Sequence, residues 1–168
     1  MPRERSKTHP AASQPRADRV KREHDETFYR SGHKLQEPSV CSRCEATYHE
    51  GRWTWALAPA DAHRVTCPAC ERIEKEYAAG IVTIRGEFAQ SHRDEIARLV
   101  GHIEEREKAE HPLKRILKIE DRGEELVVST TDSHLARGIG EALHQAYKGE
   151  LDYHYPDEGE LLSVIWTR

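Results

Sequence analysis

Apolar residues recur at helical spacing in two segments of the second half of the chain. The first segment predicts a helix over residues 88–110, which Pro112 would stop. The second predicts a helix that starts after Asp132, a good N-cap, and runs to about Tyr147 before Gly149. The two apolar stripes are Phe88, Ile96, Leu99, Val100 and Ile103, and Leu135, Ile139, Ala142, Leu143 and Ala146.

Short alternating runs around these helices predict strands over residues 81–85, 113–120, 126–130, 151–155 and about 162–166. A short helix over residues 71–79 precedes them. The order strand, helix, strand, strand, helix, strand agrees with a ferredoxin-like split βαβ domain, with one extra C-terminal strand. The predicted fold class is therefore α+β.

The first part of the chain has a different pattern. Residues 1–27 carry almost no large apolar side chain, and we expect a disordered tail there. A metal module with a short lead-in segment is expected over residues 28–72, and the α+β domain over residues 73–168.

Four cysteines form two Cys-x-x-Cys pairs, Cys41-Ser42-Arg43-Cys44 and Cys67-Pro68-Ala69-Cys70. Two such pairs joined by a hairpin are typical of a zinc ribbon, so we expect Cys41, Cys44, Cys67 and Cys70 to bind one Zn²⁺. Two disulfides or a redox pair are the alternative. His49 and His63 are further potential ligands, but four thiolates already complete a tetrahedron.

Charge is unevenly distributed along the chain, whose net charge is −4. Residues 1–39 contain nine Lys/Arg and six Asp/Glu, a balance of +3, whereas residues 71–168 contain 14 and 21, a balance of −7. Contacts with nucleic acid must therefore come from local patches. Neither a secretory signal nor a membrane-length apolar run is found, and unpaired thiols suit a reducing compartment, so a cytoplasmic location is expected.

Sequence motifs for catalysis are absent: the chain has no Walker loop, no Gly-x-Ser-x-Gly and no dinucleotide-binding glycine fingerprint. A closed four-cysteine site also leaves no coordination position for a substrate. We expect a protein that is not an enzyme and has no small-molecule substrate.

Between the cysteine pairs, Arg52, Trp53 and Trp55 form a candidate surface for stacking on RNA bases. The alternative is that the tryptophans cover the metal module. In the second long helix, Gly138 and Gly140 each lower the stability of the helix relative to alanine, because glycine has a low helix propensity. They indicate either close packing on a neighbouring element or close approach of a partner beside Arg137.

Six blocks, at residues 37–41, 51–53, 110–113, 130–137, 139–143 and 148–151, resemble a small uncharacterised family of bacterial zinc-ribbon proteins, and the resemblance covers most of residues 35–168. A weaker resemblance is to the large-ribosomal-subunit export adaptor family, which implies binding to the large ribosomal subunit, with His134 and Arg137 in the matching block. A second basic residue is expected after Arg137, where this chain has Gly138.

These observations lead to the hypothesis of a zinc-stabilised binding protein associated with the ribosome or another structured RNA, with the basic tail adding electrostatic attraction. The competing hypothesis is a protein–protein adaptor or stress-response regulator whose acidic α+β domain binds a partner. No membrane partner is expected.

Overall fold

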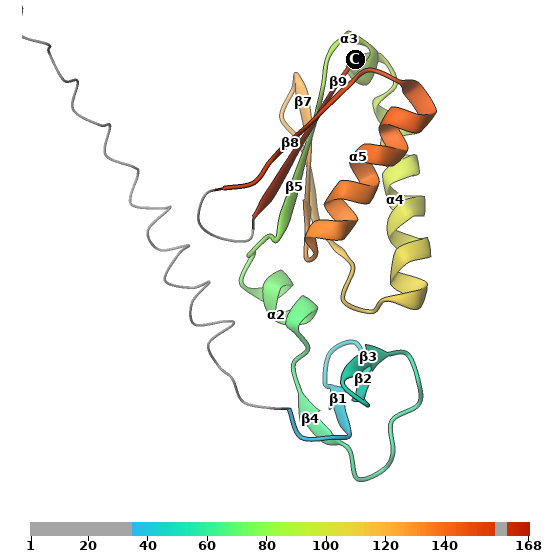
Figure 1. The fold of residues 1–168 in the computed structure, drawn as a ribbon, viewed down its shortest axis with the longest axis vertical. Helices are drawn as coiled ribbons and strands as arrows, with labels where there is room; N and C mark the ends of the chain where they lie inside the picture. Colours follow the sequence, from blue (N-terminus) through green and yellow to red (C-terminus); the bar gives the residue numbers. More distant parts are fainter. Residues whose placement is uncertain (1–34, 157–160) are drawn as a thin grey trace, which may run out of the picture. The chain divides into compact units, whose positions relative to one another are not determined.

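The computed structural model describes residues 35–156 and 161–168 (Figure 1). The segment Lys34–Arg168 forms one compact unit. The predicted disordered tail (residues 1–27) and residues 28–34 of the lead-in segment lie outside the described residues.

The cysteine module, residues 39–74, contains a small sheet and a short helix. Its strands β1 (Ser39–Cys41), β2 (Thr47–His49), β3 (Arg52–Thr54) and β4 (His63–Val65) lie in the order β3-β2-β1-β4. The hairpin predicted between the cysteine pairs is β2–β3, whose turn has Glu50 and Gly51 at positive φ. Strand β4 pairs parallel to β1.

Helix α2 (Pro68–Glu74) starts three residues earlier than predicted. Cys67 acts as its N-cap, because the Cys67 thiol accepts the backbone N–H of Cys70, and Pro68 occupies the first helical turn, where no N–H is needed. The second cysteine pair is thus placed on a helix start and not on a second turn between strands.

The sheet domain, residues 80–167, is built on β5 (Gly80–Arg85), β6 (Ile116–Asp121), β7 (Glu125–Thr130), β8 (Glu150–His154) and β9 (Leu162–Thr167). The order is β6-β7-β5-β9-β8. Neighbours are antiparallel except β5 and β9, which are parallel. The mixed α/β architecture is confirmed.

The ferredoxin-like order accounts only for β6-β7-β5. In that order β8 would lie beside β5, but β9 takes this place and β8 lies at the edge. Burial explains the exchange: Leu162, Val164 and Trp166 of β9 are all buried, whereas every second residue of β8 is exposed. The more apolar strand occupies the interior of the sheet.

Helices α4 (Arg93–Glu110) and α5 (Ser133–Tyr147) lie side by side on one face of this sheet (Figure 1). The single helix predicted over residues 88–110 is divided, because His92 leaves the helical conformation and separates α4 from α3 (Glu87–Ser91). The predicted N-cap of α5 is confirmed, since the Asp132 carboxylate accepts the Leu135 N–H at 3.0 Å.

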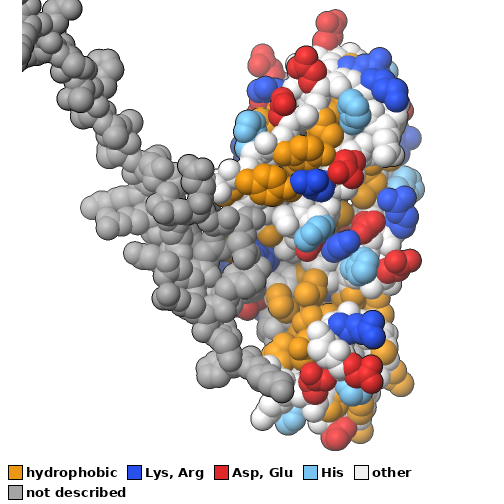
Figure 2. All heavy atoms as spheres, viewed as in Figure 1, with side chains coloured by type: hydrophobic (Ala, Val, Ile, Leu, Met, Phe, Trp, Pro, Cys, Tyr) orange, Lys and Arg blue, Asp and Glu red, His pale blue; other side chains and the backbone are white. Residues whose placement is uncertain are grey.

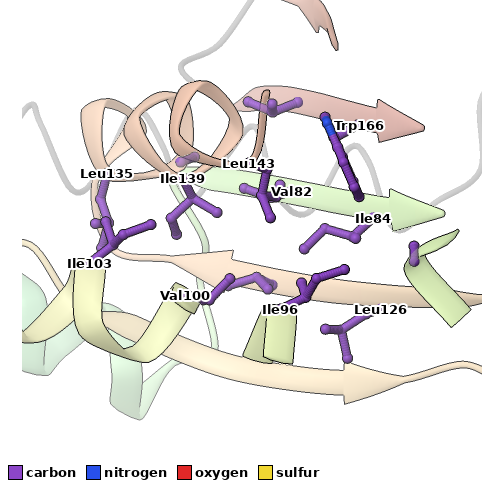
Figure 3. Close-up of a cluster of buried hydrophobic side chains, with 14 of the residues drawn as sticks. Val82, Ile84, Ile96, Val100, Ile103, Leu126, Leu135, Ile139, Leu143 and Trp166 are labelled. Carbon is purple, nitrogen blue, oxygen red and sulfur yellow. The ribbon is translucent and has the colours of Figure 1, made fainter. Parts of the chain in front are cut away.

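The main core lies between these helices and the sheet. Ile96, Val100 and Ile103 of α4 and Leu135, Ile139 and Leu143 of α5 point toward the strands (Figure 3). The predicted apolar stripes therefore face the core, with the exception of Ala146, which is exposed. None of the helices in the described ranges has the length and apolarity needed to cross a membrane.

Candidate metal centre

The four cysteines come from two local structures of the cysteine module. Cys41 ends β1, and Cys44 lies in the tight turn that follows, closed by the N–H of Cys41 bonding to the Ala46 carbonyl at 2.8 Å. Glu45 takes a positive φ of 65° in this turn. Cys67 and Cys70 lie at the start of α2, so one turn and one helix start supply two thiols each.

The four sulfur atoms gather at one point. All lie within 4.8 Å of one another, and the Sγ atoms of Cys44 and Cys67 are 3.7 Å apart. Thiolates around one zinc ion at about 2.3 Å would be separated by about 3.8 Å. A disulfide needs about 2.05 Å. The cysteines are unpaired, so the donor set fits a tetrahedral metal ion and not two disulfides.

Each sulfur receives at least one N–H hydrogen bond, and Cys67 Sγ receives a second, longer one of 4.0 Å from the Arg115 guanidinium. The backbone N–H of Cys67 donates to Cys41 Sγ at 3.3 Å, and that of Cys70 donates to Cys67 Sγ at 3.4 Å. The other two donors come from the guanidinium of Arg115, which reaches Cys44 Sγ at 2.9 Å and Cys70 Sγ at 3.3 Å. Hydrogen bonds to ionised sulfur stabilise the charged form that binds metal.

Arg115 lies just before β6, yet its side chain is only 7% exposed against the cysteine cluster. Sequence reasoning missed it, because it is separated from Cys70 and Cys44 by 45 and 71 residues. The sequence gives it no distinct signal, because Arg115 follows Lys114 in a strand pattern that also contains Lys118. Leu113 packs against the same cluster.

The pKa values of the thiols diverge. Burial opposes ionisation of Cys41, but N–H groups of the surrounding backbone outweigh it and lower its pKa to about 6. Burial raises the pKa of Cys67 strongly, and it raises the pKa of Cys70 although Arg115 acts in the opposite direction. Burial also disfavours the charge of Arg115, but its hydrogen bonds to Cys44 and Cys70 raise its pKa.

The sequence-predicted contact residues lie on different surfaces. Trp53 packs partly buried against the cysteine cluster, with the ring of Tyr48 at 5.4 Å. Arg52, the preceding residue on β3, is exposed and points to the opposite face of the strand. Trp55 is 40% exposed, and its indole N–H donates to the Lys108 carbonyl at the end of α4 at 2.6 Å.

Neither histidine of the module belongs to the metal-binding group, which consists of the four cysteines alone within the described residues. His49 is exposed and lies 3.6 Å from the Glu37 carboxylate. His63 is an exposed residue of β4.

His134 and Arg137 lie on α5. His134 is exposed, 3.6 Å from the Asp132 carboxylate. Arg137 stacks over the ring of Tyr153 at 4.8 Å and donates to the hydroxyl of Tyr155. Sequence reasoning did not connect these tyrosines with Arg137, because they belong to β8 and the segment after it.

Comparisons with known proteins do not assign this chain to a family. No family model matches the chain, and neither a curated protein nor a solved structure matches it, so the family resemblance remains a prediction.

Proposed function

We propose that this protein is a zinc-stabilised binding protein that contacts ribosomal or other structured RNA. The observation that carries the metal part is the compact group of four thiols, each with its own N–H donor. Four thiolates fill a tetrahedron, and such closed sites are structural rather than catalytic.

Tetrahedral sulfur sites suit both zinc and iron. Elemental analysis of protein purified without added metal distinguishes them, because we expect one zinc ion per chain and no iron. Substoichiometric zinc after anaerobic purification, or two disulfides by mass spectrometry, would contradict this assignment.

The proposed contact with RNA phosphates is supported by the distribution of basic side chains that have no carboxylate partner. In the sheet domain, most basic side chains have a carboxylate partner; the pairs include Arg85–Glu125, Arg93–Asp121, Lys114–Glu107, Lys118–Glu120 and Arg122–Glu120. Figure 2 shows acidic and basic side chains interspersed on the face in view, without a field of one sign. Much of the positive charge of this domain is therefore balanced by neighbouring carboxylates.

The small sheet of the cysteine module differs. Arg52 and Arg64 are exposed, and within the described part of the chain neither has a carboxylate partner. The strand register places both on one face of the sheet, opposite to the face of Cys41 and Trp53. We call Arg52 and Arg64 the arginine face and propose that it contacts RNA phosphates.

Fluorescence anisotropy with a structured ribosomal RNA fragment tests this role. Arg52→Ala and Arg64→Ala should each weaken binding and lower the slope of log K against log salt by about 1, because each arginine displaces condensed counterions. Arg43→Ala is the matched control in the same module, since Arg43 is already paired with Glu74 at 2.7 Å. Equal effects of all three variants, or no binding at low salt, would contradict an RNA contact at this face.

A protein–protein adaptor is the second candidate, and the −7 balance of residues 71–168 favours it. An acidic domain attracts basic partners at long range. Co-purification of a basic protein that resists nuclease treatment and is lost at high salt would support the adaptor over the RNA-binding protein.

A further inference from the structure

The cysteine module and the sheet domain meet through Arg115. Its guanidinium bonds closely to the sulfurs of Cys44 and Cys70 and lies 4.0 Å from that of Cys67, and its Nε–H donates to the Pro112 carbonyl at 2.7 Å. The ring of Trp55 lies 5.8 Å from the same guanidinium. Within the described residues the guanidinium has no carboxylate partner, so the sulfur cluster supplies its negative charge.

The backbone of Arg115 is bound just as firmly to the sheet domain. Its N–H donates to the Thr131 hydroxyl at 2.9 Å, and its carbonyl accepts the Thr131 N–H at 2.9 Å. Thr131 is buried and directly precedes Asp132, the N-cap of α5. A continuous path of hydrogen bonds thus runs from Cys44 and Cys70 through Arg115 to the start of α5.

We propose that Arg115 is part of the metal centre and couples metal occupancy to the order of the sheet domain around Thr131 and the start of α5. This inference rests on the proposed zinc site. A divalent ion bound by four thiolates carries two net negative charges, and the guanidinium compensates one of them. A buried guanidinium without such a partner is costly, so the Arg115 contacts depend on the centre being assembled.

The coupling follows from what holds the sulfurs in place. A bound metal ion would hold the sulfurs of the β1 turn and of the α2 start together, because all four are its ligands. Without it, Cys44 and Cys70 lose their fixed positions, and the two acceptors of Arg115 are no longer held at hydrogen-bonding distance. Conversely, Arg115 orients two of the four ligands, as outer-sphere donors do in other metal sites.

The test combines metal affinity with amide hydrogen exchange. Arg115→Met removes the charge and the donors but keeps the length of the side chain. Competition with a chromophoric zinc chelator should show a loss of affinity of about 10- to 100-fold, the range for outer-sphere variants. Arg98→Met is the matched control, since Arg98 is exposed and, among the residues that the structure describes, bonds only to the carbonyl of Asp94 on its own helix.

Hydrogen exchange measured by NMR then tests the coupling itself. In the wild type, removing zinc with a chelator should speed exchange of the Arg115 and Thr131 amides and leave that of Val128, in the centre of the sheet, unchanged. In Arg115→Met these amides should exchange fast with or without zinc. Arg115→Lys keeps the charge but cannot span two sulfurs, so the zinc affinity of this variant should lie between those of the wild type and Arg115→Met. This second variant provides the test if Arg115→Met does not fold.

The outcomes separate the two claims. Wild-type protein that binds no zinc removes the metal site and the coupling together. Zinc binding with unchanged affinity in Arg115→Met, or chelation that leaves Thr131 exchange unaltered in the wild type, overturns the coupling while the zinc site stands.

Discussion

Gly140 of α5 lies so close to Val164 of β9 that a Cβ atom at position 140 would meet Val164 Cγ1 at 2.6 Å. The added Cβ would also lie 3.0 Å from Leu151 Cδ1 of β8. The close-packing interpretation of this glycine is therefore confirmed. At Gly138, two residues earlier in α5, an added Cβ would meet nothing within 4 Å.

The two helical glycines should respond oppositely to alanine. Gly140→Ala should destabilise the protein by about 1–3 kcal/mol, because the added methyl overpacks the helix–sheet contact. Gly138→Ala should stabilise it by about 0.5–1 kcal/mol, because alanine has the better helix propensity and the space is open. Chemical denaturation followed by circular dichroism measures both, and equal effects would contradict the packing.

Loss of one metal ligand should affect the two parts of the protein differently. Cys67→Ser should abolish stoichiometric zinc binding and unfold the cysteine module, because metal binding supplies much of the folding free energy of small modules. The sheet domain should remain folded, since its core shares no residue with the cysteine cluster. Ser42→Ala, between two ligands, is the control and should retain zinc; helical circular dichroism and zinc content are the measurements.

Zinc affinity should rise with pH. In the metal-free protein the raised pKa values of Cys67 and Cys70 keep both thiols protonated at neutral pH, so binding zinc must displace about two protons from them. Lowering the pH therefore favours the protons over the metal. Calorimetry in buffers of different ionisation enthalpy counts the protons released, and a pH-independent affinity between pH 6 and 8 would contradict the thiolate site.

The tryptophans should separate structural from binding roles. Trp53→Ala should lower the stability of the cysteine module, because the ring packs on the sulfur cluster. If Trp55 stacks on an unpaired base, Trp55→Ala should cost about 1–3 kcal/mol of RNA affinity. Thermal melting must accompany the binding assay, and unchanged affinity in both folded variants would remove base stacking from the proposed function.

The sequence predicted the helices and strands well where burial follows a simple period. The stripe beginning at Leu135 and the N-cap Asp132 together specify α5, because both signals are local. The places of β8 and β9 were not predictable in the same way. Both read as alternating strands, and only the complete burial of Trp166 beside β5 decides which one lies inside the sheet.

The metal site was likewise predictable from local sequence only in part. Spacing alone identified the four cysteines, because two Cys-x-x-Cys pairs define a tetrahedral donor set. Arg115 could not be found from spacing, since its contact with Cys44 exists only once two separate parts of the chain are folded. Likewise, Arg52 and Trp53 are adjacent in sequence, yet strand alternation points them to opposite faces.

The interior position of β9 has a consequence for synthesis of the protein on the ribosome. Strand β5 pairs on one side with β7 and on the other with β9, where Gly80 meets Leu162 and Arg85 meets Thr167. Until β9 emerges, β5 has an unpaired edge with open backbone groups, which invites pairing with other chains. The nascent chain is therefore prone to aggregation in the interval between synthesis of β5 and synthesis of β9, during which most of the core residues are made.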